Sequence, residues 1–160
     1  MRHWDIRPAI LDYNPAMAST LTDLYFRSVR AIDPSIYSQE EKEAWAAEPI
    51  DYRDWALRFE KNPPYVAALN GLPVGFITLE KDGHIDLAYV DPEFQRKGLM
   101  QYLYDFLEKE AHKRQLRRLF VEASKVARPF FEKQGFHVES ENQINRNGII
   151  LINYSMGKWL

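Results

Sequence analysis

The segment VDPEFQRKGLMQYLYDFLEKEA, residues 90–111, constrains the fold more than any other part of the chain. It passes from strand-forming residues through a short polar loop with one glycine into an amphipathic helix with Leu99, Leu103, Leu107 and Ala111 on one face. The first turn of a helix has backbone N–H groups without intrahelical partners and the positive end of the helix dipole. A strand that leads into such a turn therefore predicts a site for a phosphate group.

Length and composition indicate one globular domain, residues 1–160. The chain is 46% hydrophobic and 28% charged, which is ordinary for a protein with a full core. Its 21 Lys and Arg against 23 Asp and Glu argue against a nucleic-acid partner. No apolar run reaches the roughly 18 residues that span a bilayer, and residues 1–10 lack the apolar core of a signal peptide. We therefore expect a cytoplasmic protein with no membrane partner.

The chain has no cysteine, which excludes disulfides and thiolate metal ligands. Its four histidines, His3, His84, His112 and His137, show no i,i+4 pair with a third ligand. We therefore predict no metal site.

Local patterns predict a mixture of strands and helices. Residues 5–11 form a strand at a sheet edge because Pro8 cannot donate to a ladder. Asn14, Ser38 and Asp51 begin helices. Asn70-Gly71 connects strands 65–69 and 73–80, and a further strand spans residues 84–90. Then follow a strand at 119–123, a helix at 128–134 and a hairpin of residues 137–142 and 149–156. This order predicts an α+β or mixed-sheet α/β fold.

Two motifs resemble the GNAT superfamily of N-acetyltransferases. QRKGLM, residues 95–100, resembles the acetyl-CoA loop Q/R-x-x-G-x-G/A, and SKVARPFFEKQGF, residues 124–136, resembles N-x-x-A-x-x-F-Y-E-K-x-G-F. The order of elements agrees along essentially the whole chain, and the YafP-like branch is the most similar. The resemblance implies a GNAT fold, with a mixed, mostly antiparallel central sheet of about seven strands flanked by helices.

The resemblance also implies that acetyl-CoA is the acyl donor. The main chain at the loop and the first helical turn would bind the pyrophosphate, through Arg96, Lys97, Gly98, Leu99, Met100 and Gln101. Gln95, the first residue of the motif, is a further cofactor-binding residue. Met100 departs from the small residue of the family motif. We expect its side chain to point into the core beside Leu99, so that only its N–H is used.

The pantetheine arm of the cofactor would lie along the strand that enters the loop. The resemblance assigns this contact to Leu87, Ala88, Tyr89, Val90, Ser124 and Phe131. Phe131 stands where the family has the tyrosine that acts as general acid. A phenyl ring cannot protonate a leaving thiolate, so we assign no acid.

A base is needed because an amine, with a pKa near 10.4 for lysine, is protonated at neutral pH. The resemblance places it on residues 84–90, where strand alternation puts His84 and Asp86 on one face. His84 acts directly or through water, or is merely exposed at the start of the strand. Asp86 lies in an apolar strand, where a carboxylate needs a partner.

The acceptor amine is left open. Aromatic residues of the early helices suggest a partly aromatic pocket, and they are Tyr25, Phe26, Tyr37, Trp45 and Trp55. A small amine, a peptide N-terminus and a lysine side chain all remain open as acceptors. The sequence is also compatible with a homodimer. Two functions remain: an N-acetyltransferase that works by direct attack in a ternary complex, and an acyl-CoA-binding sensor or interaction module without turnover.

Overall fold

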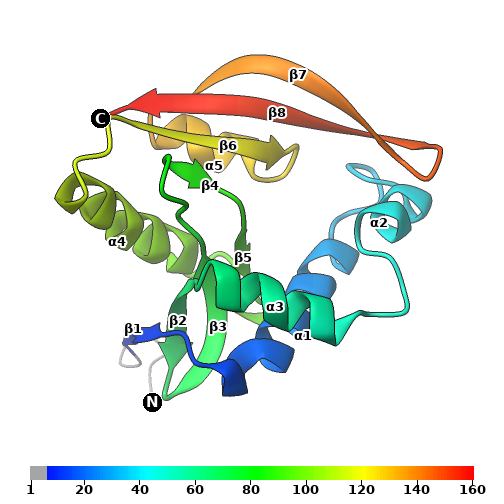
Figure 1. Ribbon diagram of the computed structural model, residues 1–160. Helices are drawn as coiled ribbons and strands as arrows, with labels where there is room; N and C mark the ends of the chain where they lie inside the picture. Colours follow the sequence, from blue (N-terminus) through cyan, green and yellow to red (C-terminus); the bar gives the residue numbers. More distant parts are fainter. Residues whose placement is uncertain (1–6) are drawn as a thin grey trace.

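The computed structural model describes residues 7–160 (Figure 1), so Asp5 and Ile6 of the predicted first strand lie outside the described residues. The strands are β1 (Pro8–Asp12), β2 (Tyr65–Leu69), β3 (Leu72–Ile77), β4 (His84–Ile85), β5 (Ala88–Val90), β6 (Arg118–Ser124), β7 (His137–Arg146) and β8 (Ile149–Trp159). The α-helices are α1 (Ala18–Arg30), α2 (Gln39–Trp45), α3 (Tyr52–Lys61), α4 (Leu99–Lys113) and α5 (Arg128–Lys133). Two 3-10 turns, η2 (Pro15–Met17) and η3 (Pro92–Phe94), complete the order.

These strands form two four-stranded sheets in place of the single sheet of about seven strands that we expected. The first sheet has the order β1-β2-β3-β5 and is antiparallel, and the second has the order β4-β6-β8-β7 with β4 parallel to β6. The cause is the segment at residues 84–90, which is not one strand. Its first two residues pair with β6 and its last three pair with β3.

Asp86 and Leu87 lie at the break between the two pairings. Leu87 donates its N–H to Thr78 Oγ1 at 2.9 Å and accepts from the Thr78 N–H at 2.9 Å, so its backbone remains bonded to the first sheet. Beyond this point β5 and β6 diverge, and Figure 1 shows β4 and β5 between the two groups of strands.

Turn residues account for the connections that the sequence predicts. Asn70 and Gly71 have φ of 51° and 80°, and Asn147 and Gly148 have 52° and 86°, the left-handed values that a two-residue hairpin turn requires. Both Asn-Gly turns are thereby confirmed. The last hairpin is longer than predicted, because β7 extends to Arg146 and β8 to Trp159.

Side-chain caps begin the early helices as predicted. Ser38 forms a capping box with Glu41, and the Asp51 carboxylate accepts from the Asp54 N–H. Asn14 caps η2, which continues into α1. None of the helices within residues 7–160 is long and apolar enough to cross a bilayer.

Strand alternation in the first sheet divides the core into two clusters. Val66 and Phe76 point toward α1 and α3, where they pack with residues such as Phe59. Their neighbours Ala67 and Ile77 point to the opposite face, toward α4. The same cluster includes side chains of β6, α5 and β8, so α4 covers parts of both sheets.

Gly83 fixes the approach of β4 to β6. Its φ is +96°, and a Cβ added there would lie 2.0 Å from the carbonyl oxygen of Arg118. Its own carbonyl accepts the Phe120 N–H at 3.1 Å. A side chain at this position would therefore push the start of β4 away from β6 and displace His84.

We predict that Gly83→Ala destabilises the fold more than Gly148→Ala does. Both glycines have positive φ, which costs an alanine roughly 1–2 kcal/mol, but nothing lies within 4 Å of a Cβ at Gly148. The overlap at Gly83 should add about 1–3 kcal/mol, as overpacking does. Urea unfolding of both variants measures the difference, and equal loss of stability would show that the contact with Arg118 is unimportant.

Candidate active site

The loop before α4 has the geometry of a phosphate site. Arg96 and Gly98 have positive φ, 62° and 79°, so the chain turns sharply and Gly98 becomes the N-cap of α4. Nothing lies within 4 Å of a Cβ added to Gly98, so the loop is open on that side. A cavity of about 440 Å³ lies here, lined by Gln95, Arg96, Gly98, Leu99, Met100 and Gln101 among others.

Lys97 is the loop residue that the structure does not bring into this cavity. Its Nζ lies 5.7 Å from the centre of the Phe94 ring, a cation–π contact. The Gln101 side chain is also engaged, since it exchanges hydrogen bonds with Gln134 at 2.9 and 2.7 Å. The donors that remain around this cavity are the main-chain N–H groups at the start of α4 and the side chains of Arg96 and Lys133.

Helix α1 holds the loop in place. Arg27 pairs with the buried carboxylate of Asp91 at 2.5 Å, and Asp91 accepts the Glu93 N–H at 3.1 Å. The Val90 carbonyl accepts from Ser28 Oγ at 2.9 Å and from Gln95 Nε2 at 3.1 Å. Because a carbonyl oxygen has two lone pairs, that of Val90 is fully used. Val90 therefore shapes the site without offering its carbonyl to a cofactor.

A second cavity, of about 420 Å³, continues from the first toward the divergence of β5 and β6. Ala88, Tyr89 and Val90 line one side, and Ser124 and Phe131 line another. Phe131 is also part of the core, since it is 2% exposed and packs edge-on against Phe130 and Phe136 with ring centres 5.3 and 5.1 Å away. The Ser124 hydroxyl accepts the Ala127 N–H at 3.1 Å.

Met100 borders both cavities. It is partly buried and packs against the core cluster around α4, whereas Leu99 is 4% exposed and lies within that cluster. Met100 thus only partly follows the expectation of a side chain directed into the core. Its thioether forms part of the wall of the groove.

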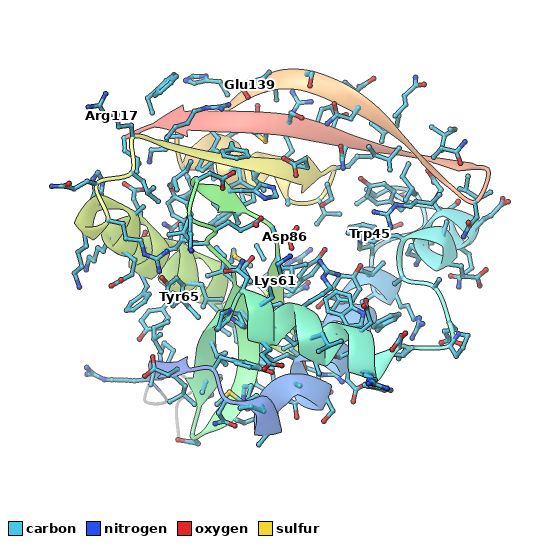
Figure 2. The ribbon with its side chains drawn as sticks, in the orientation of Figure 1. Trp45, Lys61, Tyr65, Asp86, Arg117 and Glu139 are labelled. Carbon is cyan, nitrogen blue, oxygen red and sulfur yellow. The ribbon has the colours of Figure 1, made fainter. Side chains whose placement is uncertain are left out.

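A third cavity, of about 340 Å³, meets the second one at Trp45, Tyr89 and Ser124, which line both. Asp86 and Leu87 lie on its wall. Figure 2 shows Asp86 between α3 and the strands above it, with Trp45 farther along on α2. Of the predicted aromatic residues, Tyr25, Tyr37 and Trp45 line this cavity, while Phe26 and Trp55 are buried in the core.

His84 is held by two carboxylates. Its Nδ1 lies 2.5 Å from Glu80 Oε1 and its Nε2 lies 2.7 Å from Glu122 Oε1, and the ring stacks on Phe120. Burial alone would lower the pKa of His84, but the hydrogen bonds to Glu80 and Glu122 outweigh it and raise the pKa above its usual 6.5. The imidazole is therefore stabilised as a cation, in which neither nitrogen has a free lone pair.

The partner that Asp86 needs is Arg58 of α3. Arg58 Nη2 lies 3.2 Å from Asp86 Oδ2, and the guanidinium stacks on the Trp55 ring at 4.3 Å. The Asp86 side chain is 41% exposed, so its carboxylate is both paired and open to the cavity.

Glu80, His84 and Asp86 bring potential metal-ligand atoms within 4.8 Å of one another. The His84 nitrogens already serve Glu80 and Glu122, and Asp86 serves Arg58. The geometry thus favours a charged hydrogen-bond network over a metal centre among these residues.

Three charged residues that line the third cavity were not predicted from the sequence: Glu122, Arg58 and Arg146. Glu122 had a usable signal, because it alternates with the buried Leu119–Val121–Ala123 face of β6 and so points toward His84. Arg58 and Arg146 come from α3 and β7, and no local pattern connects them with the other residues of the site.

Burial also raises the pKa of two tyrosines of this cavity, that of Tyr25 to about 12 and that of Tyr89 well above its usual value. Both phenols therefore stay protonated at neutral pH. Tyr37 connects the surrounding elements, since its hydroxyl donates to the Ile152 carbonyl at 2.6 Å and accepts the Lys125 N–H at 2.9 Å.

Comparison with known proteins identifies this arrangement. The acetyltransferase (GNAT) domain family matches residues 34–158. The chain belongs to the GNAT family of acetyltransferases. It is 33% identical over 147 residues to the uncharacterized N-acetyltransferase YafP of Escherichia coli K12, covering 92% of this chain and 93% of YafP.

Solved structures confirm the fold. A GCN5-related N-acetyltransferase from Rhodopseudomonas palustris superposes with a TM-score of 0.90 and 35% identity, over 97% of this chain and 98% of the other. The PaiA N-acetyltransferase of Thermoplasma acidophilum, solved with coenzyme A, has a TM-score of 0.76 and 20% identity over 97% and 100% of the two chains. The GNAT fold expected from the two motifs is therefore correct, with its strands divided between two sheets.

The raised pKa of His84 predicts a pH-dependent contribution to stability. A group that binds its proton more tightly in the folded state stabilises the fold below its unfolded pKa, about 6.5, and loses this effect as pH rises through the folded pKa. The free energy of unfolding of the wild type, relative to His84→Gln, should therefore be largest near pH 6 and decrease toward pH 9. A difference that does not vary with pH would contradict the assignment.

Proposed function

We propose that this protein transfers the acetyl group of acetyl-CoA to a primary amine by direct attack in a ternary complex. The observation that carries the proposal is the junction of the cavities at Trp45, Tyr89 and Ser124. On one side the groove leads to the N-terminus of α4, and on the other it opens into a cavity that contains carboxylates. A thioester at the junction would be reached by an amine from the opposite side.

Acetyl-CoA would fill the first two cavities. Its pyrophosphate would accept hydrogen bonds from the N–H groups of residues 96–101, where the dipole of α4 favours negative charge. Its pantetheine arm would lie along Ala88 and Tyr89 of the edge strand β5 and contact Ser124 and Phe131. The same fold holds coenzyme A in PaiA and acetyl-CoA in YncA of Salmonella typhimurium, which supports this placement.

The reaction requires a neutral amine. In our proposal Asp86 takes the proton from the ammonium group, and the lone pair of the nitrogen then attacks the thioester carbonyl. Collapse of the tetrahedral intermediate breaks the C–S bond. The attacking nitrogen then loses its second proton to solvent, and solvent protonates the coenzyme A thiolate because Phe131 cannot. N–H groups directed at the carbonyl oxygen would stabilise its negative charge.

His84 has a different role in this scheme from that of a free base. Its positive charge lies between Glu80 and Glu122 and reduces the repulsion among the neighbouring carboxylates. Glu122, which lines the cavity, is the group through which His84 acts on the acceptor.

The alternative, a sensor that binds acyl-CoA without turnover, is favoured by one observation. Phe131 stands where family members have the tyrosine that acts as general acid, and its phenyl ring has no proton to give to the thiolate. Release of free thiol from acetyl-CoA, followed across a panel of primary amines, separates the two functions. Thiol release with one amine supports the enzyme, and binding of acetyl-CoA without release supports the sensor.

We predict that Gly98→Glu weakens acetyl-CoA binding far more than Gly98→Ala does. Both variants place a side chain at a φ of +79°, and both have room for the Cβ. Only the glutamate adds negative charge beside the pyrophosphate, and we expect at least about a tenfold larger dissociation constant. Calorimetry measures both affinities, and equal values would show that this loop does not bind the pyrophosphate.

We predict that Asp86→Asn lowers kcat about 100-fold, because an amide cannot accept the proton of the amine. The affinity for acetyl-CoA should change by less than about twofold, since Asp86 lies on the acceptor side. Asp54→Asn, an exposed carboxylate of α3 outside the cavities, is the control. Unchanged turnover in Asp86→Asn would remove this residue from the mechanism.

A further inference from the structure

The acceptor cavity, by which we mean the third cavity, contains charges of both signs. Asp86 and Glu122 supply negative charge, and Arg58 and Arg146 supply positive charge. The phenols of Tyr25 and Tyr89 are neutral and add hydrogen-bonding groups only. A cavity with charges of both signs suits a ligand that itself carries both charges, because a purely cationic amine offers no counter-charge to a guanidinium that has no carboxylate partner.

Arg58 and Arg146 differ in what they can offer a ligand. Arg58 is already paired with Asp86 at 3.2 Å. Within residues 7–160, no carboxylate lies within 4 Å of a nitrogen of Arg146. Arg146 is thus the guanidinium in this cavity that retains its full capacity for a bidentate bond to an anion.

The position of Arg146 is set by strand register. It is the last residue of β7, next to the Asn147-Gly148 turn, and Ile144 lines the cavity from the same face two residues earlier. Arg146 pairs with Ile149 of β8, whereas Ser124, at the junction with the cofactor groove, pairs with Asn153. Four residues of strand, about 13 Å, separate these two points along β8, and the Arg146 side chain spans part of that distance.

From these observations we propose that the acceptor is a compact primary amine that carries a carboxylate several bonds away. Its amino group would lie near Asp86 and Glu122 and face the thioester at the junction, and its carboxylate would bind Arg146. A volume of about 340 Å³ lies at the small end of ligand pockets, which favours a small molecule over a protein segment. This inference rests on the proposed acetyltransfer and specifies the chemical class of its acceptor.

The test compares matched acceptors. A series of amino acids, from α-amino acids to ω-amino acids of increasing chain length, is assayed beside the carboxamide of each, with thiol release from acetyl-CoA as the readout. In the wild type the best acid should exceed its carboxamide in kcat/KM by at least about tenfold, the value of one charge-assisted contact. Carboxamides that are as good as the acids would overturn the inference.

Variants of Arg146 test whether this residue causes the preference for the acid over the carboxamide. Arg146→Gln should bring the acid-to-amide ratio close to one, because it lowers kcat/KM for the acid far more than for the carboxamide, and Arg146→Lys should retain part of the ratio. Arg53→Gln, which removes an exposed arginine of α3 outside the cavities, should leave the ratio unchanged. A ratio that survives in Arg146→Gln, or that Arg53→Gln lowers equally, would overturn the role of Arg146.

Binding of products gives a readout that needs no turnover. In the presence of coenzyme A, calorimetry should show that the N-acetylated acid binds the wild type more tightly than its carboxamide, and that Arg146→Gln abolishes the difference. Equal binding of the two products to the wild type refutes the inference even if acetyltransfer occurs. Thiol release confined to amines without a carboxylate also refutes it, whereas the absence of release with any amine refutes the proposed function.

Discussion

The hydrogen bonding of residues 84–90 determines the architecture of this protein. The segment pairs with β6 over His84 and Ile85 and with β3 from Ala88 onward, so one stretch of backbone belongs to two sheets. At the break, Thr78 binds both the N–H and the carbonyl of Leu87, so the backbone of Leu87 stays paired where the segment changes sheets. Because β5 and β6 diverge from this point, the molecule has a groove between its sheets, and both the cofactor side and the acceptor side open from it.

The same segment leads directly into the phosphate loop, so the two sites share one support. Ser28 and Gln95 bind the Val90 carbonyl, and Arg27 binds Asp91, which is 8% exposed. A buried carboxylate is stable only with such partners, because its desolvation is otherwise costly. Helix α1 thereby holds the loop from one side and presents Tyr25 to the acceptor cavity from another. A shift of α1 would alter both sites together.

Part of the fold could be predicted from interactions between residues that are close in the sequence. The two Asn-Gly turns, the glycine before α4 and the caps at Ser38 and Asp51 act within a few residues, and the sequence contains all that they require. The break at Asp86 and Leu87 was not predictable in this way. Side chains alternate between the two faces of a strand in the same manner whether the whole segment pairs within one sheet or its two halves pair with different sheets. The charged residues of the acceptor cavity depend on contacts across long separations, such as Arg58 with Asp86, and no spacing rule relates them.

The position of His84 shows how such contacts change the chemistry of a residue. In the sequence it has the pKa of a useful base, but the register of β4 with β6 places Glu122 at one nitrogen and the turn places Glu80 at the other. Two carboxylates convert the imidazole into a stable cation, which gives up its proton less readily. That cation lies beside the carboxylates of Glu80, Glu122 and Asp86, and its field offsets part of their mutual repulsion. Glu122, one of the two carboxylates on the cavity wall, accepts a hydrogen bond from this cation, so in the proposed mechanism a carboxylate of the cavity and not the imidazole receives the proton of the amine.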